Sequence, residues 1–221
     1  MENFNENNVV ELGGIVVSIP EYSHELFEEK FYKFFIETRR LSAYSDDLPI
    51  IVSERLLNID DIHEGDTLHI TGQLRSFNQA LDGKSKLVLS IFAKEIQKDE
   101  EDYVLTLNDA TFIGYICKPP IYRKTPLGRE IADVLLAVNR SYKKSDYIPC
   151  ILWGRNARFC EKIEVGAMVK INGRIQSRKY EKKDSNENII TKVAYEVSVC
   201  KFSLNEKEVE TVEIDNDIIV D

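Results

Sequence analysis

The chain repeats its own pattern at a spacing of about 100 residues, and this repeat limits the folds open to it. The segment NNVVELGGIV parallels NDATFIGYIC, which aligns Asn8 with Asn108. The segment EGDTLHITGQLRS parallels VGAMVKINGRIQS, which aligns Ser76 with Ser177. A period of this length is too long for a solenoid repeat but long enough for a whole small domain. The sequence therefore predicts two tandem domains of the same fold.

Each copy is dominated by β-branched and aromatic runs that are typical of strands. A short helix is expected over 155–162 with Phe159 and Ile163 available to face the core, and Gly173 inside a strand indicates a bulge or a bend. The strands of the second copy are expected near 110–118, 131–140, 147–153, 168–177 and 193–204. Three strands, a helix and two strands is the order of the OB barrel. The predicted fold class is therefore all-β with short helices, built as two tandem five-stranded OB-fold barrels.

Charged residues are distributed unevenly along the chain. The net charge is −9, but the balance of basic and acidic residues is −11 for 1–107, +8 for 108–204 and −6 for 205–221. A basic region inside an acidic chain favours a nucleic-acid partner, and the alternative is a pair of differently solvated faces. The domains that we expect are an acidic, degenerate OB domain over 1–97, an acidic linker over 98–107, a basic OB domain over 108–204 and an acidic tail over 205–221.

The composition favours a soluble protein that binds a partner. No apolar run approaches the roughly 20 residues of a membrane span, and the start MENFNENNVV lacks the features of a signal peptide, so we expect a cytoplasmic protein. The 4 cysteines are widely spaced, which indicates buried free thiols and neither a metal site nor a cofactor. No catalytic motif is present, and we expect no enzymatic activity. In the first copy, the insertion SIPEYSHELFEEK suits a short helix or a solvated flap.

The run DYIPCILWG contains the single tryptophan of the chain and a tyrosine six positions before it. In a strand, Ile148 and Leu152 share one face and are expected to enter the core, whereas Tyr147 and Trp153 share the other face. The two rings either pack under another layer or a partner subunit, or stack on planar groups such as bases. Two rings on one strand face within a basic domain favour stacking on bases.

The second copy resembles the bacterial single-stranded DNA-binding protein family. The motifs RKTPLGREIADVLLAVNR, SDYIPCILWGRNA, VGAMVKINGRIQSRKY and YEVSV follow one another in the family's order between Asn108 and Leu204. The resemblance implies an OB fold that assembles as dimers or tetramers and wraps single strands around aromatic and basic side chains. This chain departs from the family by having two OB domains and a short tail without the family's Pro-Phe ending.

The resemblance assigns stacking positions to Tyr147 and Trp153 in the third strand and to Tyr180 in the extension of the fourth strand, with Tyr142 as a further match. Lysines and arginines near these rings are expected to contact phosphates. This basic set comprises Arg123, Lys124, Arg140, Lys143, Lys144, Arg174, Arg178, Lys179, Lys182, Lys183 and Lys192.

The first copy lacks these rings, because the repeat aligns Asp47 with Tyr147, Ser53 with Trp153 and about Gln79 with Tyr180. We therefore expect the first OB domain to be a structural or protein-binding copy.

The expected partner is single-stranded DNA, bound without sequence preference and protected during replication, recombination or repair at the nucleoid. The same platforms accept single-stranded RNA. A homodimer would bring four OB folds around one axis. The tail end is expected either to bind replication or repair proteins, to compete with anions for the groove, or to be a frayed or β-paired terminus: Asp215, Asp217, Ile218, Ile219, Val220 and Asp221. The alternative function is a primosome or recombination scaffold whose OB folds mainly bind proteins.

Overall fold

The two copies of the repeat each form a closed, five-stranded OB barrel. The structure, a computed structural model, describes residues 7–56, 58–81, 84–99, 101–141, 143–183 and 187–204. The strands of the first half are β1 (Asn8–Val16), β2 (Glu21–Leu26), β3 (Glu29–Arg39), β4 (Ser45–Ser53), β5 (Thr67–Leu81) and β6 (Lys84–Lys98). Those of the second half are β7 (Asn108–Ile116), β8 (Ile121–Lys124), β9 (Glu130–Arg140), β10 (Lys144–Trp153), β11 (Met168–Lys183) and β12 (Ile189–Leu204).

Strand pairing closes each barrel in the same order. In the first half β3 pairs with β4, β4 with β6, β6 with β5, β5 with β1, and β1 returns to β3. In the second half the equivalent ring runs through β9, β10, β12, β11 and β7 and returns to β9. Only the β4–β6 and β10–β12 pairs are parallel among these. The predicted fold class is therefore confirmed.

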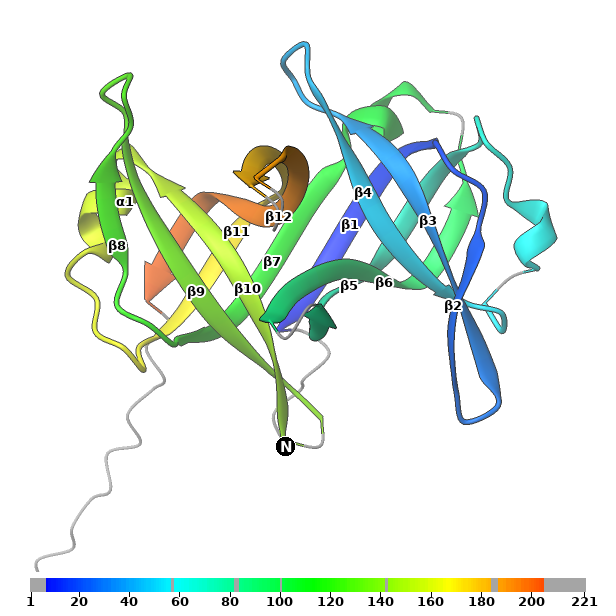
Figure 1. Cartoon of the computed structure of the whole chain (residues 1–221), viewed down its shortest axis with the longest axis horizontal. Helices are drawn as coiled ribbons and strands as arrows, with labels where there is room; N and C mark the ends of the chain where they lie inside the picture. The colour runs from blue at the N-terminus through cyan, green and yellow to red at the C-terminus, as the bar shows by residue number, and fades with distance from the viewer. Residues whose placement is uncertain are drawn as a thin grey trace, which may run out of the picture.

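The two barrels lie side by side and are joined by their first strands. β1 and β7 run next to each other in the middle of the molecule (Figure 1) and pair antiparallel. Asn8 lies opposite Phe112, Val10 opposite Ala110, and Leu12 opposite Asn108. Because the repeat aligns Asn8 with Asn108 and Leu12 with Phe112, the pairing is symmetric about its centre. The halves are thus related as the subunits of a two-fold dimer would be.

The core is built from the inward faces of the strands, as the period of two predicts. In β10, Ile148, Cys150 and Leu152 are buried, and the equivalent side chains Leu48 and Ile50 of β4 are buried in the first half. The alternation explains why these short apolar runs form strands and not helices.

Two glycines allow β5 and β11 to bend where each barrel turns a corner. The ladder between β11 and β12 shifts register between Asn172 and Gly173, and the ladder between β5 and β6 shifts between Thr71 and Gly72. A Cβ at Gly173 would lie 2.3 Å from the carbonyl oxygen of Ser198. The bulge predicted at Gly173 is confirmed.

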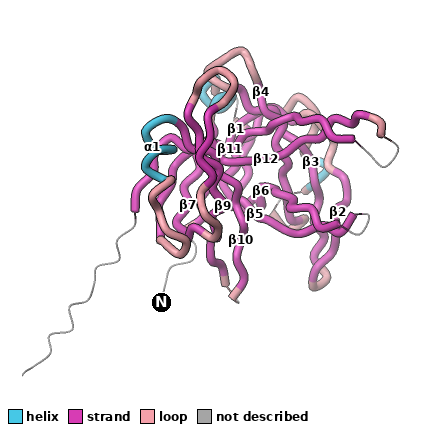
Figure 2. The backbone as a smooth tube through the Cα atoms, turned by 60° about the vertical axis from the view of Figure 1, so that its left-hand side comes forward, coloured by secondary structure: helices cyan, strands magenta, loops and turns pink. Residues whose placement is uncertain are grey.

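The helical elements are few and peripheral (Figure 2). Helix α1 (Gly154–Cys160) follows β10, and Ala157 and Cys160 enter the core. Phe159, which was expected to face the core, is 48% exposed and packs edge-on against Phe202, so that prediction was wrong. The first half has only the 3-10 turn η1 (Ile59–Asp61) at the equivalent place among the described residues.

The insertion of the first copy is not the short helix that was one of its two expected structures; it is solvated, as the alternative predicted, and it forms a strand. Its residues form β2, which pairs antiparallel with β3 and is exposed along its whole length. Tyr22 on β2 meets Tyr32 on β3 edge to face, with ring centroids 6.2 Å apart. Cross-strand pairing outweighs the acidic composition from which a helix was expected.

The segment expected to be a linker packs on the first barrel. Between the end of β6 at Lys98 and the start of β7, residues of η2 (Asp102–Thr106) lie against β1. Gly13 donates its backbone N–H to the carbonyl oxygen of Leu107 at 2.9 Å, and Val104 is buried. The exact domain bounds stay a prediction, but this stretch is not a free tether.

In the described part of the chain, no helix has the length and apolar character that crossing a bilayer requires.

Candidate nucleic-acid interface

The outer face of β10 carries the two aromatic residues that were expected to stack on bases. Tyr147 is 43% exposed and Trp153 is 37% exposed, whereas Ile151 between them is buried. Six residues of a strand span roughly 20 Å, so the rings offer two separate platforms. The indole N–H of Trp153 donates to the hydroxyl oxygen of Ser198 on β12 at 3.1 Å. This bond fixes one edge of the ring while part of it stays accessible.

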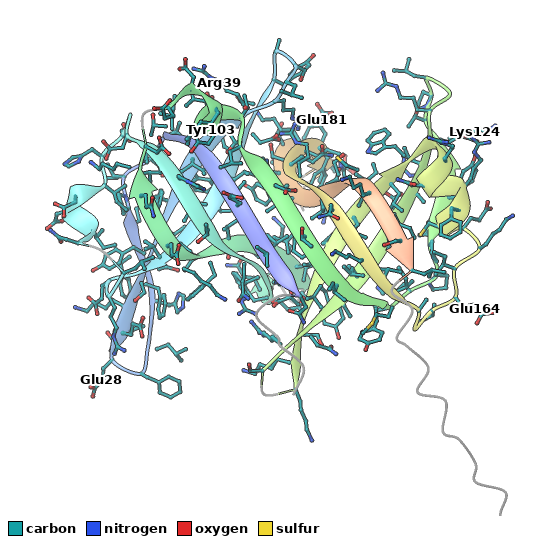
Figure 3. The ribbon with its side chains drawn as sticks, turned by 180° about the vertical axis from the view of Figure 1, so that it is seen from behind. Glu28, Arg39, Tyr103, Lys124, Glu164 and Glu181 are labelled. Atoms are coloured by element: carbon teal, nitrogen blue, oxygen red, sulfur yellow. The ribbon has the colours of Figure 1, made fainter. Side chains whose placement is uncertain are left out.

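Trp153 borders a basic depression at the start of α1. A pocket of about 420 Å³ is lined by Trp153, Gly154 and the β8–β9 hairpin, from which Lys124, Arg129 and Glu130 contribute. Figure 3 shows Lys124 near the tip of this region. Arg129 was not in the predicted set, although it belongs to the same basic run as Lys124. Its proximity to Trp153 arises from the fold and could not be read from the spacing.

Arg123 is the member of this hairpin whose charge is already matched. Its guanidinium donates to the carboxylate of Asp133 through Nε at 2.6 Å and through Nη2 at 3.2 Å. The pair is exposed, so it contributes little to stability, but it lowers the net charge that Arg123 offers to a phosphate.

Tyr147 lies where the two barrels meet. Its backbone N–H donates to the hydroxyl oxygen of Ser76 on β5 at 2.7 Å. The turn between β9 and β10 adds Lys143, and Lys144 begins β10; both side chains are exposed. Tyr142, the fourth stacking residue expected from the sequence, lies outside the described residues.

Tyr180 stands near the end of β11 among basic side chains. Its ring is half-buried, and the guanidinium of Arg178 lies 5.8 Å from the ring centroid. Lys192 of β12 is its cross-strand partner, and Lys179 and Lys182 are exposed. The backbone of Lys183 ends the strand, but its side chain lies outside the described part of the structure.

Two predicted phosphate ligands turn out to neutralise buried carboxylates. Arg174 donates through Nη2 to Asp46 at 2.9 Å, and Arg140 lies 3.5 Å from Asp146. Both carboxylates are fully buried, and a buried carboxylate without a neighbouring cation would strongly destabilise the fold. These pairs reduce the charge that Arg174 and Arg140 can offer to a phosphate, and their place in the phosphate set stays a prediction. Arg140 also lines a groove of about 760 Å³ in the first half.

These contacts form two equivalent clusters that cross between the barrels. Asp46 of β4 accepts the backbone N–H of Ser177 on β11 at 2.7 Å, and Asp146 of β10 accepts the backbone N–H of Ser76 on β5 at 2.8 Å. Burial raises the pKa of the Asp46 carboxyl, but hydrogen bonds from Arg40 and Ser177 outweigh burial and hold that pKa below its ordinary value. The clusters fix the position of Tyr147, which directly follows Asp146.

The cysteines are free, as expected, but not all are buried. Cys150 and Cys160 lie in the core, Cys117 is half-buried and Cys200 is exposed. In the part of the chain that the structure describes, no group of three or more histidine, cysteine, aspartate or glutamate side chains is arranged to hold a metal ion.

The predicted tail residues, 215 and 217–221, lie outside the described residues.

Comparisons with known proteins agree on one family. The Single-strand binding protein family matches residues 107–204. Single-stranded DNA-binding protein B of Bacillus subtilis (strain 168) is 36% identical over 96 residues, which are 39% of this chain and 82% of that protein. Single-stranded DNA-binding protein 2 of Listeria innocua is 33% identical over 97 residues, which are 41% of this chain but only 61% of that protein.

A solved structure extends the likeness to both barrels. The single-stranded DNA binding protein from Thermus aquaticus superposes with a TM-score of 0.74, covering 90% of this chain and 93% of that chain at 16% identity. At this identity the likeness concerns the fold alone.

Proposed function

Because the chain belongs to the Single-strand binding protein family, we propose that it binds single-stranded DNA without sequence preference, mainly through its second barrel. The observation that carries the proposal is the outer face of β10, where Tyr147 and Trp153 are both exposed. Every base has a π face, so rings on such a surface bind any sequence. We assign the protein a binding role and no chemical step.

In this proposal, bases stack on Tyr147, Trp153 and Tyr180 while basic side chains neutralise phosphates. Cations placed around these rings include Lys124 and Arg129 beside Trp153. The other cations in this set are Arg140, Lys143, Lys144, Arg174, Arg178, Lys179, Lys182 and Lys192. Each neutralised phosphate releases counterions, so affinity should fall as salt rises.

The cellular role in replication, recombination or repair at the nucleoid in the cytoplasm belongs to the same proposal. We also propose that two copies associate, so that four OB folds act together. The strands β5, β1, β7 and β11 form one continuous sheet on the back of the molecule (Figure 3), and a second copy could face this surface. Light scattering of the purified chain would give twice the mass of one chain if this is correct.

The experiment that tests DNA binding uses the fluorescence of the single tryptophan, Trp153. We expect oligo-dT to quench it strongly, duplex DNA to quench it weakly, and the affinity to fall as salt rises. Tyr147→Ala should weaken oligo-dT binding by about 1 to 3 kcal/mol without removing the fluorescent residue. The control is Tyr103→Ala, an exposed tyrosine on η2 that should leave binding unchanged. Equal losses in both variants would contradict the assignment.

A further inference from the structure

We infer that the β2–β3 hairpin of one copy of this chain inserts Phe27 into the pocket beside Trp153 of a second copy. The contact joins two different surfaces, so each copy in a pair keeps one free hairpin or one free pocket. The ring occupies the surface that bases use in the proposed function. Self-association and DNA binding therefore exclude each other, and this competition rests on the proposed function.

The tip of the β2–β3 hairpin holds a large apolar side chain out in solvent. Leu26 lies opposite Glu29 in the ladder, so Phe27 and Glu28 form a two-residue turn, and Phe27 is 89% exposed. Both turn residues have positive φ, 50° for Phe27 and 61° for Glu28. Glycine and asparagine adopt this backbone with little strain, whereas a bulky residue does not. The turn alone does not account for Phe27, which points to a role at the surface.

Acidic side chains border this apolar tip. Glu25 and Glu28 are exposed, and neither takes part in an ion pair within the described residues, whereas Glu29 is paired with Arg55 at 3.3 Å. The segment 25–30 carries three glutamates and one lysine. Negative charge at the tip repels phosphates, so the hairpin does not suit nucleic acid. It fits a protein surface that offers an aromatic or apolar pocket with cations beside it.

The pocket beside Trp153 has these properties. Lys124 and Arg129 line it with exposed side chains, and in the described part of the chain no ion pair involves either of them. Glu130 also lines the pocket, but its carboxylate lies 3.2 Å from Arg158, so its charge is already matched. The pocket therefore offers two free cations beside an aromatic ring.

Two glycines keep the pocket open. Gly128 and Gly154 line it, and a Cβ at either would meet no atom within 4 Å. Leu127, which precedes Gly128 in the β8–β9 turn, is 84% exposed and adds an apolar edge. A phenyl ring can lie against Trp153 here while the flanking glutamates reach the cations.

The hairpin and the pocket cannot meet within one chain. Figure 3 shows Glu28 and Lys124 at opposite ends of the molecule, so a second copy must supply the hairpin. The charge of the whole chain favours this arrangement. The balance is −11 for 1–107 and +8 for 108–204, so the acidic half of one copy faces the basic half of the next.

Sedimentation of the full chain without DNA tests the contact. The interface is small, so we expect a dissociation constant of about 10 µM to 1 mM and a mean mass that rises over this range. Phe27→Asn removes the ring, suits the positive φ and should weaken this association by about 10-fold or more, while leaving the proposed two-fold dimer intact. Leu41→Asn is the control and should change nothing, because it replaces a side chain that is 98% exposed on the β3–β4 turn.

Mixing two defective variants tests whether two different surfaces are joined. Lys124→Glu with Arg129→Glu keeps the hairpin but reverses the charge of the pocket, whereas Phe27→Asn keeps the pocket. Neither variant should self-associate through this contact alone, but their mixture should sediment faster than either one. The emission of Trp153 should move to shorter wavelength in the mixture, because the indole ring becomes covered.

Oligo-dT of about 8 nucleotides should reverse the association of the wild type, because bases displace Phe27 from Trp153. The inference is overturned if the wild-type mass does not rise beyond the dimer up to about 1 mM, if Phe27→Asn and Leu41→Asn behave alike, or if the mixture sediments no faster than its components. If Phe27→Asn abolishes the association but oligo-dT does not reverse it, the inference stands. The proposed stacking of bases on Trp153 then fails.

Discussion

Replacing Asp46 by alanine should destabilise the fold more than any other single change to a carboxylate of the first half. Its side chain is fully buried and accepts five hydrogen bonds, two from Arg40, one from Arg174 and two from Ser177. The substitution leaves two guanidinium groups without their counterion. Removing one partner of a buried ion pair costs about 3 to 5 kcal/mol.

Thermal unfolding at neutral pH would measure this loss. In a chain of this size each kcal/mol lowers the melting temperature by roughly 2 to 4 °C, so Asp46→Ala should melt about 6 to 20 °C lower. Asp47→Ala is the matched control, because the neighbouring carboxylate is exposed and accepts no hydrogen bond that the structure records. Similar melting temperatures for both variants would refute the assignment of the buried cluster.

Lowering the pH should reduce the difference in melting temperature between the wild type and Asp46→Ala. The folded pKa of Asp46 lies below its ordinary value of 3.8, since the hydrogen bonds from Arg40 and Ser177 outweigh burial. A carboxyl whose pKa is lowered by folding stabilises the protein above its unfolded pKa and loses that contribution as pH falls through the folded pKa. The gap in melting temperature should thus be full at neutral pH and shrink below about pH 4. A gap that does not change with pH would mean that the charge of Asp46 is not what stabilises the fold.

Three further outcomes are expected. Lys143→Gln should reduce the slope of log affinity against log salt for oligo-dT by up to about 0.7, as loss of one phosphate contact does; an unchanged slope would remove Lys143 from the site. Gly13→Ala should lower stability by about 1 to 3 kcal/mol in urea unfolding, because the new Cβ would lie 2.0 Å from the carbonyl oxygen of Val104. In a thiol titration near neutral pH, Cys200 should react first, because it is exposed, whereas burial raises the pKa of Cys160 to about 11 and keeps its reactive thiolate scarce; fast labelling that persists in Cys200→Ser would contradict this.

The sequence predicted the fold well because the alternation of apolar and polar residues is a local pattern and occurs in both copies of the repeat. Alternation in β10 identifies Ile148 and Leu152 as core residues, and Gly173 identifies the bulge. Predictions failed where they rested on local composition but the structure depends on contacts between different segments. The acidic insertion that became β2 gains its structure from β3, and the position of Phe159 depends on Phe202, which is distant in the sequence.

The candidate site was predictable only in part, for a physical reason. The exposure of Tyr147 and Trp153 follows from the period of two in a strand. The ion-pair partner of a charged side chain does not follow from any local pattern. Arg174 looked free in the sequence because Asp46 is 128 positions away, and only the packing of the barrels brings them together. The exposed ring of Phe77 in the first copy has no aromatic counterpart in the second, because the repeat aligns it with Arg178, so the repeat pattern does not point to it.

The pairing of β1 with β7 inside one chain keeps the two barrels together at low protein concentration and allows them to differ in their side chains. Two separate subunits come apart when they are dilute, whereas two halves on one short connection face each other at an effective concentration of about millimolar. A substitution in a homodimer also appears on both sides of the axis, but here it appears on one. The two barrels can therefore carry different side chains at equivalent positions, as Asp47 and Tyr147 do. A ligand that contacted both barrels would meet a different set of side chains at each of its ends.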